Sequence, residues 1–311
     1  MRPLTRATLR GVWGTLLLPV EADQTIDWGR LESDLRHLLG AGLDGLYAHG
    51  TAGEFFTLDE VEFGRVNRLL ADRCEAQGIP FQIGASHMSA QTCRQRVRRA
   101  TELRPGAIQV TLPDWVPLSD EEVVGAVAGL AAEARPVPIV LYNPPHAKTI
   151  VPPELYGRLA RDVPELIGVK VLGGDDAWYR AVRGAAPDLA LFVAGTTLAS
   201  GLRRGAAGSY SNIACLSPQG ASAWYRTMGA DPDAAAELES RIVTFFERQV
   251  KPLQRAGYGS PALDKFLAAV GGWGSAGVRV RWPYRSVPEE AVLAARTEAR
   301  RLLPELVAPS T

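Results

Sequence analysis

The stretch "LIGVKVLGG" (166–174) decides the fold class, because this short apolar run has the character of a strand that is buried on both faces. Such strands are typical of parallel sheets whose two faces are covered by helices. One residue does not fit the run. Lys170 stands between Val169 and Val171, where its ammonium group would lose its water shell. The stretch therefore raises two questions: which sheet the strand joins, and why it carries a lysine.

Apolar runs of this kind recur along the chain at intervals of roughly 25–35 residues, with amphipathic segments between them. The eight runs are 11–20, 45–50, 81–85, 107–113, 139–145, 167–172, 189–195 and 205–214. Helices are expected at 28–40, 58–76, 89–103, 119–133 and 154–161, several of them opened by the capping residues Asp27, Thr57, Ser89 and Ser119. Eight strand–helix units predict a closed (β/α)8 TIM barrel of the α/β class. A doubly wound open sheet would need a Gly-rich dinucleotide turn after the first strand, and none follows it.

After about residue 230 the strand pattern stops and helical patterns take over. We therefore expect a barrel with the catalytic site over 1–229 and a C-terminal helical extension over 230–311. The extension needs an apolar partner, so it is expected to pack on the barrel or at a subunit contact. With 311 residues, 46% of them hydrophobic and 22% charged, the chain has enough apolar material for one large core.

Charge and cysteine content indicate which partners and compartments to expect. The formal net charge is zero and the pI is about 6.9, which argues against nucleic acid and against an anionic membrane surface. The basic cluster is expected to be a solvated helix face; its members are Arg94, Arg96, Arg98 and Arg99. The three cysteines are odd in number and form no CxxC pair, which favours reduced thiols in the cytoplasm; they are Cys74, Cys93 and Cys215.

Three further features are absent from the sequence pattern. The N-terminal run is too short for a signal peptide, and no segment is long enough to span a bilayer. The histidines show no HxH or HExxH spacing, so no metal ligand is expected among them; they are His37, His49, His87 and His146.

Lys170 has a chemical explanation in a barrel, because active sites of this fold lie at the carboxyl ends of the strands. Only four of the 34 Lys and Arg residues are lysines, yet a lysine occupies this position. Burial lowers the pKa of an amine, and a neutral amine attacks a ketone to give a protonated Schiff base, which is an electron sink. That chemistry needs no metal or cofactor. It needs a proton carrier, which Tyr142 on the adjacent strand and the hydroxyl of Thr51 can provide.

Simpler explanations exist for each residue alone. A lone lysine near a strand end commonly snorkels or forms a salt bridge. A strand tyrosine is commonly part of the core, and a GxxGE turn by itself is a weak helix-entry signal. The conjunction of all three favours the catalytic interpretation.

Three motifs carry a family resemblance: "GTAGE" (50–54), "LYNPP" (141–145) and "GVK" (168–170). In this order and at these separations they resemble the dihydrodipicolinate synthase / N-acetylneuraminate lyase family of class I aldolases. The similarity extends through 192–212 and 250–272, so it covers almost the whole chain. The resemblance implies a (β/α)8 barrel with extra C-terminal helices, a homo-oligomer (tetramer or dimer), and action on pyruvate or a related 2-oxo acid.

The resemblance also implies roles for individual residues. Lys170 would form the imine, and Tyr142 would relay protons. Thr51 would connect that phenol to the relay and, with the N–H of Ala52, would bind the substrate carboxylate. Glu54 would brace its loop without reacting. The pocket floor would be formed by the strand-eight segment; its residues are Ser209, Tyr210 and Ser211.

Three departures from the family pattern bear on the substrate. Ala52 replaces a second hydroxyl in the turn, so one carboxylate donor is missing. In the synthases the position of Trp115 is occupied by a tyrosine that joins the proton relay of the neighbouring subunit. With Trp115 there, the proton relay would end in water or in another group such as Tyr210. The loop 144–153 lacks the arginine that the synthases use and offers His146 and Lys148. These positions are expected to decide specificity.

The resulting expectation is a Schiff-base-forming lyase, an aldolase or dehydratase acting on pyruvate or another 2-oxo acid, sugar-derived acids included. Dihydrodipicolinate synthase activity is the alternative within the class. A catalytically silent barrel that binds a small oxo acid is an alternative of another class. A phosphate-handling barrel is a third, because Gly205 and Gly208 lie in the strand-eight region where such barrels bind phosphate. The sequence leaves the aldehyde partner and the direction of reaction open.

Overall fold

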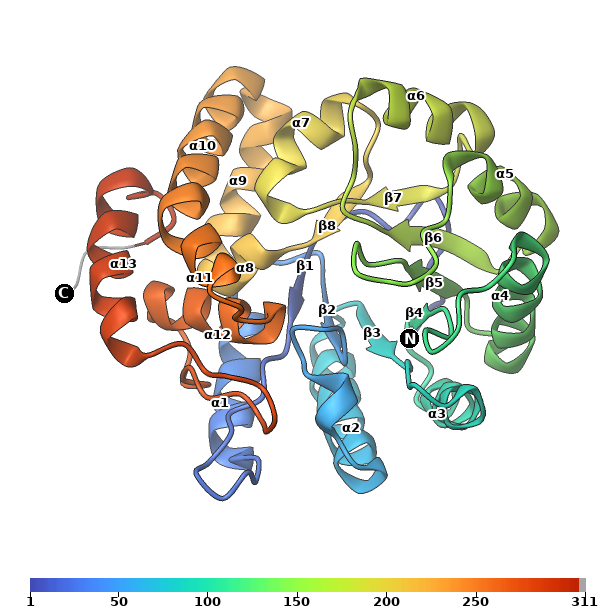
Figure 1. Cartoon of the computed structure of the whole chain (residues 1–311), viewed down its shortest axis with the longest axis horizontal. Coiled ribbons are helices and arrows are strands. Elements are labelled where there is room, and N and C mark those ends of the chain that lie inside the picture. Colours follow the sequence, from blue (N-terminus) through green and yellow to red (C-terminus); the bar gives the residue numbers. More distant parts are fainter. Residues whose placement is uncertain (308–311) are drawn as a thin grey trace.

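A computed structural model describes residues 1–307 of the chain. Its eight strands run parallel and close into a barrel in sequence order, which confirms the predicted TIM barrel (Figure 1). The strands are β1 (Gly11–Thr15), β2 (Gly45–Ala48), β3 (Phe81–Gly84), β4 (Ala107–Thr111), β5 (Ile139–Tyr142), β6 (Leu166–Lys170), β7 (Ala190–Phe192) and β8 (Gly208–Tyr210).

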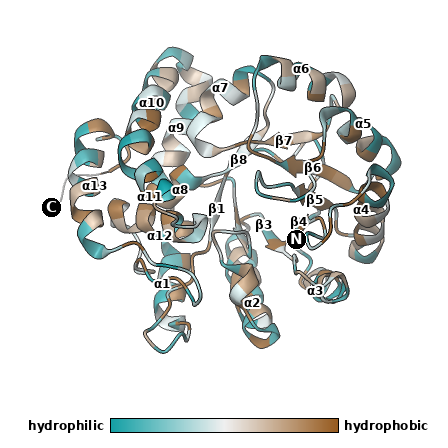
Figure 2. Ribbon diagram, viewed as in Figure 1, coloured by the Kyte–Doolittle hydropathy of each residue, from teal (hydrophilic) through white to brown (hydrophobic). Residues whose placement is uncertain are grey.

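The helices between the strands form the outer layer of the barrel. They are α1 (Trp28–Leu39), α2 (Glu60–Gln77), α3 (Ala90–Glu102), α4 (Asp120–Ala134), α5 (Pro153–Asp162), α6 (Asp176–Ala185) and α7 (Leu198–Arg203). In Figure 2 the strands are largely brown, whereas teal residues gather on the outer turns of the helices. This distribution is expected of parallel strands that are buried on both faces.

Three of the four predicted caps are confirmed. The side chains of Asp27, Ser89 and Ser119 each accept a backbone N–H at the start of their helices. The prediction for Thr57 is wrong, because this residue ends a 3-10 turn (Phe55–Thr57). Helix α2 begins after Asp59, which forms a capping box with Glu62.

The last predicted strand is shorter than the apolar run that suggested it. The run 205–214 contains only three strand residues, and the short helix α8 (Asn212–Leu216) follows. Ser211 caps this helix by accepting the N–H of Ala214 at 3.2 Å. The run mixes a strand with a helix because both are buried and therefore apolar.

The helices after β8 gather on one side of the barrel, orange to red in Figure 1. They are α9 (Pro218–Ala230), α10 (Pro232–Phe245), a π-helical turn (Phe246–Val250), α11 (Lys251–Arg255), α12 (Ser260–Gly271) and α13 (Glu289–Leu302). Helix α12 packs on α8, which leads directly out of β8, and α13 packs on α12 and α10. The C-terminal segment therefore reaches the mouth of the barrel through α12.

The core has two parts. The larger lies between the strands and the helices, and the smaller fills the barrel interior; the latter contains Leu9, Trp13, Tyr47, Ala107, Val140, Ile167, Ala190, Phe192, Ala207 and Tyr210. Position 84 on β3 requires glycine, because a Cβ there would lie 2.2 Å from the carbonyl oxygen of His49. Within residues 1–307, no helix is both long and apolar enough to cross a membrane.

Candidate active site

Tyr142 and Lys170 occupy the last positions of the neighbouring strands β5 and β6 and are register partners. Parallel strands present paired residues at the same height, so both side chains reach the carboxyl end of the barrel together. The Nζ atom of Lys170 lies 4.1 Å from the centre of the Tyr142 ring. The structure thus brings together the two residues that the sequence selects for imine chemistry.

The Lys170 amine lies among three tyrosine rings. Besides Tyr142, the rings of Tyr47 and Tyr210 have their centres 5.1 Å from Nζ. Within residues 1–307, Nζ has no hydrogen-bond or ion-pair partner among side chains or carbonyls. Burial lowers the pKa of the amine to about 8, although Asp264 and Cys215 act in the opposite direction. Lys170 is therefore neither a snorkelling residue nor half of a salt bridge.

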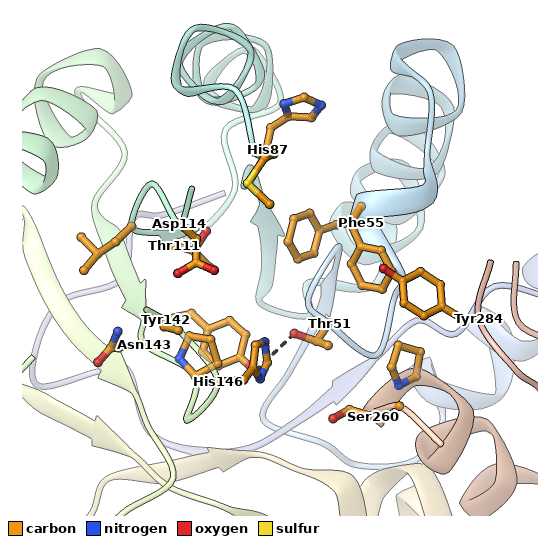
Figure 3. Close-up of a pocket in the computed structure, with 17 residues that line it drawn as sticks. Thr51, Phe55, His87, Thr111, Asp114, Tyr142, Asn143, His146, Ser260 and Tyr284 are labelled. Atoms are coloured by element: carbon orange, nitrogen blue, oxygen red, sulfur yellow. Dashed lines mark hydrogen bonds between the residues drawn. The ribbon is translucent and has the colours of Figure 1, made fainter. Parts of the chain in front are cut away.

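Thr51 and Tyr142 form the hydroxyl pair that the sequence predicts. Thr51 Oγ1 donates to the phenol oxygen at 3.2 Å, as the dashed line in Figure 3 marks. Burial raises the pKa of Tyr142, so the phenol keeps its proton near neutral pH. A protonated phenol beside an amine and a second hydroxyl is suited to pass protons.

A buried ion pair anchors the turn that carries Thr51. Glu54 is fully buried, and its carboxylate lies 2.5 Å from Nζ of Lys265 on α12. The same carboxylate accepts the backbone N–H of Arg281 at 3.0 Å. Glu54 is therefore fully engaged in joining the turn to the C-terminal segment and has no access to substrate.

Arg96 corrects the prediction of a solvated arginine face on α3. Its side chain is fully buried and donates to the carbonyls of Phe55, Leu58 and Ser86 at 2.9–3.3 Å. It also forms a salt bridge with Glu60 at 2.8 Å. The residue braces the segment that follows the turn, a role invisible in a basic sequence cluster.

The turn also offers unused backbone donors. The N–H groups of Thr51 and Ala52 have no hydrogen-bond acceptor among residues 1–307. Both residues line a hollow of about 220 Å³ that also contains Lys170. An anion in this hollow would find two amide donors and the Thr51 hydroxyl within one turn.

Tyr210 and Ser211 line the same hollow, whereas Ser209, which was also expected at its floor, is fully buried and does not line it. The hydroxyl of Tyr210 donates to Gln82 in the barrel interior at 2.7 Å. Within the described part of the chain, no hydrogen bond joins this hydroxyl to Thr51 or Tyr142. Tyr210 thus contributes its ring to the amine site, and its hydroxyl is engaged elsewhere.

A second hollow of about 480 Å³ opens beside the first, and the two share Thr51, Tyr142 and Ser260 (Figure 3). Its apolar lining consists of Phe55, Phe56, Met88, Leu112, Pro144, Ala147, Pro261 and Tyr284. Its polar lining includes His87, Thr111, Asp114, Asn143 and His146. We call the smaller space the inner hollow and the larger one the outer hollow.

The three loop residues expected to decide specificity separate in the structure. His146 lines the outer hollow. Trp115 and Lys148 line neither hollow, and the Trp115 side chain is 75% exposed. Lys148 donates to the Trp115 carbonyl at 2.7 Å and lies over its ring. These two residues pair with each other at the rim.

His49 lies in the bend that follows β2, and its side chain is buried. Its ring stacks on Phe63 at 4.7 Å between centres, and burial lowers its pKa to about 3, so it is neutral. Within residues 1–307, no group of three or more His, Cys, Asp or Glu side chains is arranged to hold a metal ion.

Two residues that line the inner hollow are not identified by the sequence patterns. Tyr47 on β2 looks like an ordinary core residue, and Asp264 on α12 belongs to the C-terminal helices. Strand β2 is apolar and buried throughout, so its pattern does not distinguish Tyr47 from a core residue. Nothing in the sequence around Asp264 indicates that α12 turns this carboxyl toward the barrel.

The chain is similar to known proteins over most of its length. The model of the family described as "Dihydrodipicolinate synthetase family" matches residues 8–298. A 4-hydroxy-tetrahydrodipicolinate synthase of Ehrlichia canis is 27% identical over 172 residues, which are 55% of this chain and 57% of that protein. An N-acetylneuraminate lyase of Citrobacter koseri is 29% identical over 209 residues, which are 64% and 67% of the two chains. The chain thus matches about half to two thirds of the length of these curated relatives.

Solved structures share the fold over nearly the whole chain. YagE of E. coli K12, a prophage protein of the dihydrodipicolinic acid synthase family in complex with pyruvate, has a TM-score of 0.83 and 21% identity, and the match covers 94% of this chain and 98% of that one. A 4-hydroxy-tetrahydrodipicolinate synthase of Methylacidiphilum fumariolicum has a TM-score of 0.83 and 23% identity, with 96% and 97% covered. At these identities the likeness establishes the fold.

Proposed function

The chain belongs to the dihydrodipicolinate synthetase family, whose members are lyases of the class I aldolase type, and from this premise we propose that Lys170 forms a Schiff base with a 2-oxo acid. The enzyme then cleaves a C–C bond or expels water beside the imine. The observation that carries the proposal is a partly buried amine without a hydrogen-bond or ion-pair partner among residues 1–307, with a pKa of about 8, held 4.1 Å from the centre of the Tyr142 ring. An amine of that pKa is partly neutral near pH 7, and therefore nucleophilic.

The proton steps of imine formation fall to Tyr142 and Thr51. Attack of Nζ on the C2 carbonyl gives a carbinolamine, whose hydroxyl must leave as water. Tyr142 supplies that proton, and Thr51, which donates to the phenol oxygen at 3.2 Å, passes a proton onward. Among residues 1–307 neither hydroxyl bonds to a charged side chain, so both can exchange protons with substrate and solvent.

The substrate carboxylate fits the turn. Thr51 and Ala52, whose N–H groups have no acceptor among residues 1–307, line the same space as Lys170, so carboxylate and carbonyl carbon can be bound at the same time. Because Ala52 brings no hydroxyl, this subsite depends on backbone donors and on Thr51. We therefore assign the inner hollow to the 2-oxo acid end of the substrate.

The outer hollow takes the remainder of the substrate. No lysine or arginine is among its lining residues in the described part of the chain, and His146 is one of two histidines there. A second carboxylate, as dihydrodipicolinate synthase chemistry requires, would lack a fixed cationic partner at this place. The polar groups of Thr111, Asp114 and Ser260 suit hydroxyl groups better. This favours an aldolase or dehydratase over the synthase.

A substrate panel tests this assignment. Candidate acids are 2-oxo-3-deoxy sugar acids, 4-hydroxy-2-oxo acids and N-acetylneuraminate, with pyruvate plus aspartate semialdehyde as the synthase reaction. NMR distinguishes release of pyruvate from loss of water. The proposal expects turnover of at least one hydroxylated acid and none of the synthase pair; turnover of the synthase pair alone would reverse the preference, and binding without any turnover would favour the silent barrel.

The expected homo-oligomer stays a prediction. Large apolar side chains are exposed beside the mouth of the barrel, among them Met88, Trp115 and Val116, each more than 60% accessible. Burying such groups between subunits would be favourable. Light scattering on the purified chain measures the assembly directly, and a monomeric mass would contradict the prediction.

A further inference from the structure

Helix α12 brings one acidic side chain to the Lys170 amine. Asp264 lines the inner hollow together with Lys170, Tyr142 and Cys215. It arrives from outside the barrel, since α12 packs on α8 at the carboxyl end of β8. The proposed imine mechanism assigns no role to this carboxyl group.

The orientation of Asp264 is fixed by its neighbour in the chain. Lys265 is fully buried, forms the ion pair with Glu54 and donates to the Arg279 carbonyl at 2.5 Å. These two bonds set the rotation of α12 about its own axis. Consecutive helix residues point in directions about 100° apart, so holding Lys265 against Glu54 also fixes where Asp264 points.

The carboxyl group faces the hollow without a protein partner. Within residues 1–307 it takes part in no hydrogen bond and no salt bridge, and its side chain is partly accessible from the hollow. The titratable groups that face it are Lys170 from β6, Tyr142 from β5, Tyr47 from β2 and Cys215 from α8. Of these, only Lys170 becomes a cation.

A carboxyl group that is poorly solvated and has no hydrogen-bond partner is costly to keep, and such groups cluster at functional sites. Burial raises the pKa of Asp264 to about 7, and the Lys170 cation opposes this shift. The group can therefore give and take a proton under the conditions in which the amine reacts.

We propose that Asp264 is a further catalytic residue, whose carboxylate removes a proton from carbon 3 of the Lys170 imine and returns it there. The proposal rests on imine formation at Lys170. Its geometric basis is the shared hollow of about 220 Å³, because a 2-oxo acid bonded to Nζ would occupy the space that the Asp264 carboxyl group also lines.

The step balances without any further reactant. In the protonated imine, the Asp264 carboxylate takes the proton from carbon 3, and the electron pair of that C–H bond forms the C2–C3 double bond. The pair of the C=N double bond moves onto Nζ. An iminium and a carboxylate thus become a neutral enamine and a neutral acid, and the removal of two opposite charges from a poorly solvated site is favourable. In the return step the acid reprotonates carbon 3.

In this mechanism the two sets of proton carriers act at different atoms of the substrate. Tyr142 and Thr51 serve the oxygen that leaves carbon 2 during imine formation and re-enters on hydrolysis. Asp264 serves carbon 3, where the enamine forms. A variant of Asp264 should therefore separate two events that a variant of Tyr142 slows together.

The test compares imine formation with carbon-acid exchange in the full-length chain. Pyruvate is incubated with the protein in D2O, and NMR follows the loss of methyl protons; a parallel sample is reduced with borohydride, and the modified protein is counted by mass. Asp264→Asn should still be modified to completion, while methyl exchange falls on the order of 10²–10³-fold. Asp233→Asn, an exposed carboxylate on α10, is the matched control and should exchange at the wild-type rate.

A pH profile separates catalysis from a merely structural role. Wild-type exchange should increase with pH up to about 7 as Asp264 ionises, and this limb should be missing in Asp264→Asn. Asp264→Glu keeps a carboxylate and should exchange faster than the Asn variant.

Unchanged exchange in Asp264→Asn, or equal exchange in the Asn and Glu variants, would overturn the proposal. Failure of the wild-type chain to be modified at all would instead overturn the imine function on which it rests.

Discussion

The amine of Lys170 lies 4.1 Å from the ring centre of Tyr142, its register partner on the next strand. This relationship follows from the barrel itself, since parallel pairing sets the heights of the two residues and the carboxyl ends of the strands form the mouth. The two reactive groups are thus held by strands and not by loops. Rigid placement of this kind is what an imine mechanism needs, because the amine attacks carbon 2 while the phenol protonates the oxygen that leaves it.

Replacing Lys170 tests the nucleophile. Lys170→Ala and Lys170→Arg should both abolish turnover, because a guanidinium stays protonated and cannot form an imine. Lys251→Arg on α11 is the matched control, since Lys251 is exposed and pairs with Glu247. The steady-state rate of pyruvate release is measured for the wild type and for each variant. Retained activity in Lys170→Arg would exclude covalent catalysis by this residue.

Replacing Tyr142 tests the proton carrier. Tyr142→Phe keeps the ring beside the amine and removes only the hydroxyl that accepts from Thr51. Both formation and hydrolysis of the imine should slow on the order of 10²–10³-fold, with little change in thermal stability. Single-turnover kinetics measure both steps. A variant that keeps most of its rate would show that another group carries the proton.

The lowered pKa of Lys170 predicts the pH dependence of imine formation. Because burial brings this pKa from 10.5 to about 8, the neutral amine accumulates as pH increases toward 8. The rate of imine formation should increase about tenfold per pH unit below this point and level off above it. A rate that continues to increase toward pH 10.5 would mean that the amine is unperturbed.

The same shift has a consequence for folding. Between pH 8 and 10.5 the unfolded chain binds more protons at this lysine than the folded chain does. The contribution of Lys170 to the free energy of unfolding therefore becomes more favourable as pH increases through that window. Denaturant titrations of wild type and Lys170→Met at pH 7.5 and 10 measure this effect. The free energy of unfolding of the wild type, relative to that of the variant, should be higher at pH 10 than at pH 7.5.

The buried pair of Glu54 and Lys265 predicts a large effect on stability. Lys265→Met leaves the Glu54 carboxylate buried without its ammonium partner, which should reduce the free energy of unfolding by about 3–5 kcal/mol. Urea titration measures the loss. The double variant Glu54→Gln, Lys265→Met should recover part of it, because no unpaired charge remains. A loss below about 1 kcal/mol, the value of an exposed pair, would contradict a stabilising role for this contact.

Sequence patterns were sufficient where strand periodicity decides the outcome. The eight apolar runs give the barrel, and the register of β5 and β6 then brings Tyr142 to Lys170. The place of the Thr51 turn at the mouth of the barrel could also be predicted, because the turn comes directly after β2. These residues belong to elements whose place in the fold is set by local pattern and by the order of the strands.

Other features depend on how distant segments pack, which local pattern does not encode. Arg96 belongs to a basic cluster but is buried, because the carbonyls beyond the Thr51 turn need donors. Asp264 lies beside Lys170 because α12 is anchored through Lys265 to Glu54, more than 200 residues earlier in the chain. Trp115 and Lys148 bind each other at the rim, where loop conformation and not sequence spacing decides the contact.

The most direct test of the imine account is the mass of the peptide that contains Lys170 after borohydride reduction in the presence of pyruvate. The account predicts one pyruvate-derived addition, located at Lys170 and absent from the Lys170→Ala chain. An unmodified Lys170 peptide, with pyruvate shown to bind by a separate titration, would contradict it.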